Sequence, residues 1–303
     1  MNEKKPLTIQ IWHFLLHLRW HYQLFILSGG YLLGGYFTSE MDWQMFLVQF
    51  LNVHLLLFGG ATAYNSYWDR DEGPIGGLKN PPKMSDWMWF ASLFLQAVGL
   101  IIAIPAGNLF IAVYGVSMLF FWLYSSPMAR WKGKPIRSLL AIGISTGTNS
   151  MLLGFLAAGG QTIGLTEGLA ALGVALVILS LYPTSQIYQM EEDRRRGDRT
   201  FAVEFGAEGV LKFYSIAFGL GILLLSITIL STSYWLGGFF FITGLISGRW
   251  VWNQLTQLSS EWEDYRRVMN IKYGTSLAFV AFLTLSILLR HTDFGIFLGI
   301  NLF

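Results

Sequence analysis

Two acidic segments have residue types and spacings suited to binding a divalent cation. Asn65 and Asp69 are four residues apart at the end of an apolar stretch, so on a helix they share one face. Gln189 and Asp193 repeat this spacing at the end of another apolar stretch, and Gln186 lies one turn earlier. Oxygen ligands favour a hard cation, above all Mg²⁺, which is completed by phosphate oxygens and water. The two segments therefore predict a magnesium site.

Further carboxylates accompany both pairs. Asp71 and Glu72 follow the first pair, and Glu191 and Glu192 lie within the second. Either segment alone has an alternative interpretation as a solvated, charged loop. We predict that the metal ligands are Asn65, Asp69, Asp71, Glu72, Glu192 and Asp193. We expect the catalytic residues among them to be Asn65, Asp69 and Asp193.

The basic residues near both clusters indicate what the metal would hold. Lys79 and Lys83 follow the first cluster, and arginines 194–196 and Arg199 lie in the second. A diphosphate bridged by Mg²⁺ fits between two such clusters, because the metal and the cations neutralise a leaving group. A hydrocarbon tail would then lie among apolar helices. Such a site would ionise an allylic diphosphate and release pyrophosphate.

The rest of the sequence indicates the elements that position these clusters. The chain has 303 residues, of which 53% are hydrophobic and 13% charged, and its mean hydropathy is +0.49. Soluble proteins carry about 25% charged residues. The composition therefore excludes a disordered protein and argues strongly against a soluble enzyme. A net charge of +2 argues against nucleic-acid binding. We predict an all-α, polytopic membrane protein of about nine transmembrane helices. The predicted spans are 14–37, 44–66, 86–106, 108–126, 138–160, 163–187, 208–231, 234–249 and 271–290.

The basic residues also predict the orientation in the membrane. Nearly all of them lie at the N-terminus and in the connections after the even-numbered spans, and Arg290 is the clear exception. Under the positive-inside rule, the N-terminus and the acidic loops are cytoplasmic and the C-terminus is on the opposite side. The bilayer is thus one expected partner. Because the acidic residues end the spans rather than interrupt them, and no repeat is evident, a transporter is less favoured.

Several other residues have two readings. His13, His17 and His21 recur at every fourth position, and interfacial helix residues are favoured over a metal stripe. Arg19 either snorkels to the interface or points toward an anion. Aromatic rings beside the clusters are expected to surround a carbocation through cation–π attraction. These rings are Tyr64, Tyr67, Trp68, Tyr124 and Tyr188.

Together, these features make the sequence resemble the UbiA superfamily of intramembrane prenyltransferases over most of its length. Asn65 and Asp69 match the start of its first signature, Asn-x-x-x-Asp-x-x-x-Asp, and Asp193 matches the last Asp of its second. The segments 79–83, 124–132 and 197–206 resemble the family's loops. The resemblance implies one domain over 1–303, a helical bundle around a central cavity open to lipid, Mg²⁺ and a polyprenyl diphosphate donor. We predict that these residues contact the substrate: Lys79, Lys83, Arg130, Lys132, Arg199, Gln186, Gln189, Tyr67, Tyr124 and Tyr188.

The sequence departs from both signatures. The third position of the first falls on Gly73, and the earlier Asp positions of the second fall on Gln186 and Gln189, which are weaker Mg²⁺ ligands. The leading hypothesis is Mg²⁺-dependent transfer of a prenyl group to a lipophilic acceptor in the membrane. The second is a terpene cyclase of UbiA type that needs no acceptor. The third is a membrane protein or transporter without enzymatic activity.

Overall fold

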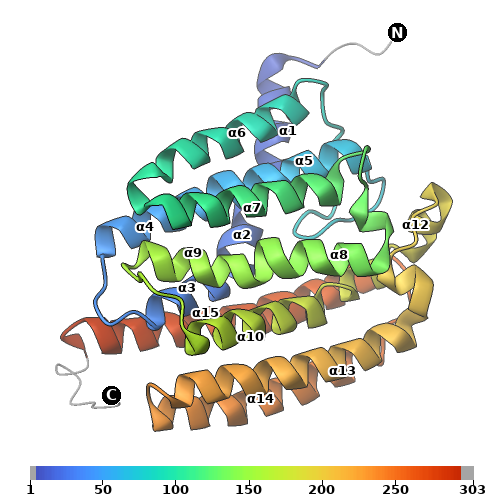
Figure 1. The fold of residues 1–303 in the computed structure, drawn as a ribbon. Coiled ribbons are helices and arrows are strands. Elements are labelled where there is room, and N and C mark those ends of the chain that lie inside the picture. Colours follow the sequence, from blue (N-terminus) through green and yellow to red (C-terminus); the bar gives the residue numbers. More distant parts are fainter. Residues whose placement is uncertain (1–4, 295–303) are drawn as a thin grey trace.

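The computed structural model describes residues 5–294, and this part of the chain consists of helices joined by loops, with no β-strand (Figure 1). The all-α prediction is therefore confirmed. The predicted sides of the two chain ends concern residues 1–4 and 295–303, which lie outside the described residues. In chain order the helices are α1 (Leu7–Leu18), α2 (Trp20–Ile26), α3 (Ser28–Tyr36), α4 (Trp43–Leu51), η1 (Asn52–Phe58), α5 (Gly59–Asp69), α6 (Met88–Ile102), η2 (Ile104–Ala106), α7 (Asn108–Ser125), η3 (Trp131–Gly133), α8 (Pro135–Ile142), η4 (Gly143–Thr148), α9 (Asn149–Ala157), α10 (Leu165–Leu181), α11 (Thr184–Ile187), α12 (Met190–Arg196), α13 (Phe201–Leu230), α14 (Tyr234–Leu255) and α15 (Asp264–His291).

The predicted number of spans is only approximately met. Within the described residues, six continuous helical segments are long and apolar enough to cross a membrane, and α6 is a shorter apolar helix. The first predicted span, 14–37, is divided among α1, α2 and α3. The break between α1 and α2 lies at Arg19, which adopts the left-handed conformation at φ 49°. The chain is an integral, multi-pass membrane protein.

Two of the long helices are built from three consecutive pieces. The pieces α4, η1 and α5 form one segment from Trp43 to Asp69, and α8, η4 and α9 form another from Pro135 to Ala157. In each, the central piece is a π-helix, Asn52–Phe58 or Gly143–Thr148. π-Helical turns inside α-helices are frequent at functional sites. Thr146 of η4 and Phe58 of η1 both line the cavity described below.

Small residues allow the helices to approach closely. A Cβ on Gly34 of α3 would overlap the backbone of α9, and a Cβ on Gly154 of α9 would overlap the backbone of Tyr31 in α3. Such small-residue contacts are typical of helix packing in membranes, where little hydrophobic effect separates helix from lipid. Along the lower edge of Figure 1, α13 and α14 lie side by side and α10 packs on α13.

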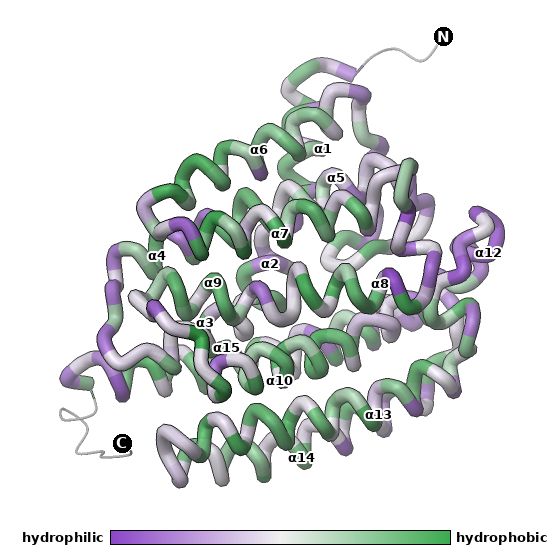
Figure 2. The backbone as a smooth tube through the Cα atoms, in the orientation of Figure 1, coloured by the Kyte–Doolittle hydropathy of each residue, from purple (hydrophilic) through white to green (hydrophobic). Residues whose placement is uncertain are grey.

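Polar residues gather at one end of the bundle. Figure 2 shows the apolar helical lengths in green, and α12 with its neighbouring loops in purple. The segments that follow α5 and α11 meet there, because Arg196 of α12 forms an ion pair with Asp71 after α5, at 2.8 Å. The two predicted acidic clusters thus lie at the same end of the molecule.

Candidate active site

A cavity of about 280 Å³ opens at this polar end. Three carboxylates line it: Asp69, Asp71 and Asp193. Deeper along the same helices the lining becomes apolar. Phe58 precedes Asn65 along η1 and α5, and Val174 of α10 precedes Tyr182, the residue that follows the end of that helix. The cavity therefore combines a charged mouth with an apolar interior.

The first acidic cluster is fixed by the end of α5. The helix stops at Asp69 because Arg70 turns into the left-handed conformation at φ 52°, and its N–H donates to the carbonyl of Ser66. Asn65 donates its side-chain amide to the hydroxyl of Ser125 in α7, at 3.2 Å. This hydrogen bond uses the nitrogen end of the amide, so the Asn65 oxygen keeps its capacity to bind a cation.

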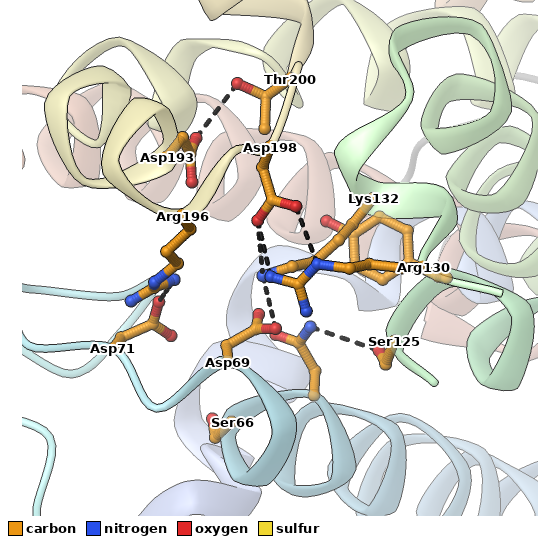
Figure 3. Close-up of polar contacts among 12 residues, drawn as sticks. Ser66, Asp69, Asp71, Ser125, Arg130, Lys132, Asp193, Arg196, Asp198 and Thr200 are labelled. Carbon is orange, nitrogen blue, oxygen red and sulfur yellow. Dashed lines mark hydrogen bonds and ion pairs between the residues drawn. The ribbon is translucent and has the colours of Figure 1, made fainter. Parts of the chain in front are cut away.

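Lys132 is the principal cation of this cluster (Figure 3). Its ammonium forms an ion pair with Asp69, and both residues are buried. It also lies 3.9 Å from Asp198. Arg130 holds the same Asp198 through two hydrogen bonds of 2.8 and 2.7 Å, and this contact raises the pKa of the Arg130 guanidinium. Lys132 faces the cavity, whereas Arg130 supports it from outside the lining.

The second acidic cluster is less charged than the first. Gln186 accepts a hydrogen bond from the N–H of Ala202, and the Gln189 amide donates to the carbonyl of Pro74, both at 3.2 Å. Asp193 accepts a hydrogen bond from Thr200 at 3.1 Å. Burial raises the pKa of Asp193 to about 6, although the charge of Lys132 opposes this shift. Gln186, Gln189 and Asp193 all line the cavity.

Two predicted metal ligands lie outside the cavity lining. Glu192 is buried, and it accepts a hydrogen bond from the N–H of Glu72 at 2.9 Å and pairs with Arg196. The side chain of Glu72 is exposed. Both residues join the two acidic segments to each other, so Asn65, Asp69, Asp71 and Asp193 are the predicted ligands that the fold brings to the cavity.

Three predicted phosphate contacts, Lys79, Lys83 and Arg199, lie outside the cavity lining. The histidines at positions 13, 17 and 21 hydrogen-bond the carbonyls of Lys83, Pro82 and Gly77, and so fasten the loop after α5 to α1 and α2. Lys79 and Lys83 of this loop are exposed. Arg199 is exposed too, and it pairs with Glu204 of α13. The three histidines therefore hold this loop through its backbone carbonyls.

Of the predicted aromatic residues, Tyr124 is the one that lines the cavity. Its hydroxyl hydrogen-bonds Tyr182, which sequence reasoning did not single out, at 2.9 Å. Tyr67 packs edge-on against Trp68, and both lie outside the lining. Tyr188 is buried against Tyr265.

Two further cations, Arg19 and Lys272, line the cavity. Arg19 is buried and donates to the carbonyls of Gly76 and Thr62, at 3.0 and 3.1 Å. Of the two interpretations of Arg19, the structure supports the one in which it points into the cavity rather than snorkelling to the interface. Lys272 lies in α15, where it donates to Ser185 at 3.1 Å. The signal for Lys272 is a lysine within the first turns of an apolar helix, where ionisable groups usually have a functional role.

The donor set can be compared with what Mg²⁺ requires. In the described residues, no three side chains of the types His, Cys, Asp and Glu are close enough to form a complete metal cage. Mg²⁺ usually relies on one or two carboxylates, with the remaining positions filled by substrate phosphates and water. Asp69 and the Asn65 oxygen at one wall, with Asp193 at the other, fit that pattern.

Comparisons with known proteins identify the family and the fold. Residues 24–274 match the model of the UbiA prenyltransferase family. A UbiA homolog from Archaeoglobus fulgidus bound to DMAPP and Mg²⁺ has a similar structure, with a TM-score of 0.71 and 17% identity, over 90% of this chain and 98% of that one. The same protein bound to GPP and Mg²⁺ gives 0.70 and 17%, over 91% and 99%. A digeranylgeranylglyceryl phosphate synthase gives 0.61 and 18%, over 92% and 99%. No match is found among curated proteins.

Proposed function

Because the chain belongs to the UbiA prenyltransferase family, we propose that its cavity binds a polyprenyl diphosphate with Mg²⁺ and transfers the prenyl group to a lipophilic acceptor in the membrane. The observation that carries this proposal is the meeting of Asp69 and Asp193, from segments more than a hundred residues apart, at the mouth of one apolar cavity. The UbiA homolog from Archaeoglobus fulgidus binds DMAPP or GPP together with Mg²⁺, which supports the same pairing here. We also propose that residues 1–303 form one domain.

Each region of the cavity has a part in the reaction. The diphosphate is proposed to lie at the polar mouth, and its hydrocarbon tail among apolar residues such as Phe58, Phe121 and Val174. Asn65, Asp69 and Asp193 would hold Mg²⁺, with Asp71 beside them. Bound Mg²⁺ would supply positive charge that stabilises the leaving diphosphate.

The chain's own cation assists the same step. Lys132 is held at the mouth by Asp69 and Asp198, so its ammonium is oriented before substrate binds. As the bond from the first prenyl carbon to oxygen breaks, the electron pair leaves with pyrophosphate. The acceptor then forms a bond to that carbon and gives up a proton. The apolar lining keeps water from the carbocation in the meantime.

A product assay tests the proposal. Purified protein is incubated with Mg²⁺ and a panel of prenyl diphosphates, with and without aromatic, tetrapyrrole or carotenoid acceptors, and pyrophosphate and products are measured. Product that requires an acceptor is expected. Cyclic hydrocarbon without acceptor would instead indicate a cyclase, and no turnover with any pair would contradict prenyl transfer. Asp69→Asn and Asp193→Asn should lower turnover at least about 100-fold, and Glu208→Gln, an exposed control, should not.

We also propose that the polar end of the cavity faces the cytoplasm. The basic residues at this end support the assignment through the positive-inside rule. The chain has no cysteine, so single cysteines report accessibility without background. Lys79→Cys should react with an impermeant thiol reagent only in inverted vesicles, and Gly107→Cys, at the other end of the bundle, only in right-side-out vesicles. The opposite pattern would overturn the orientation.

A further inference from the structure

The cavity has an unusual distribution of charge between its two acidic clusters. The first cluster presents Asp69 and Asp71, and each carboxylate has a cation, Lys132 or Arg196. The second presents Asp193 with two neutral glutamines, Gln186 and Gln189. Among the described residues, Asp193 has no ion-pair partner and accepts a hydrogen bond from Thr200.

The second cluster offers little to a metal ion of its own. The carbonyl oxygen of Gln186 already accepts a hydrogen bond from the N–H of Ala202, and the Gln189 side chain is held by Pro74. Glu192, the next carboxylate, faces Arg196 and the N–H of Glu72 outside the cavity lining. One carboxylate is thus left for a divalent cation on this wall. Mg²⁺ usually needs one or two carboxylates besides phosphate and water. Because Asp193 is proposed to help hold the Mg²⁺ of the first cluster, no carboxylate among the described residues of this wall's cavity lining remains for a second ion.

A lysine lies on the same wall. Lys272 is 6% exposed, and its ammonium lies 3.1 Å from the hydroxyl of Ser185, which precedes Gln186 in the chain. Ser276 and Phe279 follow it on the cavity-facing side of α15. In the described part of the chain, Lys272 makes no ion pair with a carboxylate.

A buried ammonium without an anion is costly, because it gives up hydration and gains no opposite charge. A ligand that brings negative charge into the cavity removes that cost. A diphosphate with one Mg²⁺ keeps a net negative charge, and a lysine ammonium is a compact, mobile cation suited to phosphate oxygens. Lys272 lines the cavity together with Gln186 and Gln189, and its ammonium contacts Ser185, the residue before Gln186. Its positive charge could therefore take the part that a second metal ion would have on this wall.

We propose that Lys272 binds the diphosphate directly in place of a second metal ion, so that the loaded site contains a single divalent cation. This inference rests on the proposed function, since it assumes that the cavity binds a diphosphate. In this arrangement Asn65 and Asp69 would hold the one Mg²⁺, with Asp193 contributing from the opposite wall. The ammonium of Lys272 contacts the diphosphate from the α11 and α15 side. Lys272 thereby assists departure of pyrophosphate as a catalytic residue.

The number of bound ions provides a readout that does not depend on turnover. Purified protein is titrated with Mn²⁺ in the presence of saturating inorganic pyrophosphate, and bound Mn²⁺ is counted by electron paramagnetic resonance. One pyrophosphate-dependent Mn²⁺ per chain is expected. Two such ions per chain would overturn the proposal.

Pyrophosphate affinity tests the lysine itself. Lys272→Gln should raise the Kd of pyrophosphate at least about tenfold by calorimetry in Mn²⁺ and leave the ion count at one, since a charge-assisted hydrogen bond to phosphate is lost. Lys272→Arg keeps the charge and should stay within about threefold of wild type. Lys212→Gln, at an exposed lysine of α13, is the matched control and should change nothing. An unchanged Kd of pyrophosphate in folded Lys272→Gln would overturn the proposal. The same holds if this variant loses affinity for the acceptor alone.

The two proposals fail separately. If no prenyl transfer is found but one Mn²⁺ and the Lys272 dependence are observed, the assignment of Lys272 to diphosphate stands and the reaction is a different one. If prenyl transfer is found with two ions, or with no effect of Lys272→Gln on pyrophosphate, the proposed function stands and this inference is wrong.

Discussion

Lys132 and Asp69 form a buried ion pair that joins the segment after α7 to the end of α5. The two residues are 63 positions apart in the sequence, and each lies in a different acidic or basic motif. The pair closes one side of the cavity mouth, and Asp198 from the loop after α12 completes it at 3.9 Å. Three separate segments therefore meet at one ammonium (Figure 3).

Removal of this ammonium should destabilise the fold. Lys132→Met leaves the buried Asp69 without its cation, and breaking a buried pair in this way typically costs about 3–5 kcal/mol. Thermal unfolding in detergent, without Mg²⁺, measures the loss. Lys212→Met breaks an exposed pair with Glu208 and should leave the melting temperature unchanged. Equal melting temperatures for the two variants would show that the buried pair contributes little.

The stability of the metal-free protein should depend on Asp193 between pH 3.8 and about 6. Burial raises the pKa of this carboxyl from 3.8 to about 6, so the folded state binds its proton more tightly than the unfolded state. The stabilisation from that proton is fully present below pH 3.8 and is lost as the pH rises through about 6. Wild type should therefore lose stability relative to Asp193→Asn across this window, as measured by chemical unfolding at fixed pH steps. A constant difference between the two proteins would refute the shift.

Aromatic substitutions should separate rings inside the cavity from rings outside it. Tyr124 lines the cavity and Tyr67 does not. Tyr124→Leu removes a ring that can face the carbocation, and such contacts contribute about 0.5–2 kcal/mol, so kcat should fall up to about 30-fold. Pyrophosphate affinity should change much less, because it does not involve a carbocation. Tyr67→Leu is the control, and an equal loss of kcat in both variants would contradict the assignment.

Helix contact between α3 and α9 should not tolerate a methyl group. A Cβ at position 154 would overlap the backbone of Tyr31, which cannot move as a side chain can. Gly154→Ala should therefore lower stability by about 1–3 kcal/mol in thermal unfolding. Gly115→Ala in α7 adds a methyl group into open space and should be neutral or slightly stabilising. A neutral Gly154→Ala would show that the two helices separate easily.

The sequence by itself determined the membrane-embedded, all-helical class and the family. Long apolar stretches predict spanning helices because backbone groups must be satisfied within lipid. The local spacing of Asn65 with Asp69, and of Gln189 with Asp193, predicted which helix faces carry oxygen ligands, since residues four apart share a face. These features depend on residues that are close in the sequence, so they can be predicted without the tertiary structure.

Tertiary structure decided which of the charged residues reach the cavity. Lys79, Lys83 and Arg199 have the right type and lie near the motifs, but all three are exposed and lie outside the cavity lining. Lys272 is more than seventy residues from either motif, yet α15 packs beside α11 and places it next to Ser185. Spacing along the sequence determines only which face of its helix a residue occupies. Which faces meet depends on long-range packing, such as the glycine contacts of α3 with α9, and no local pattern encodes that choice.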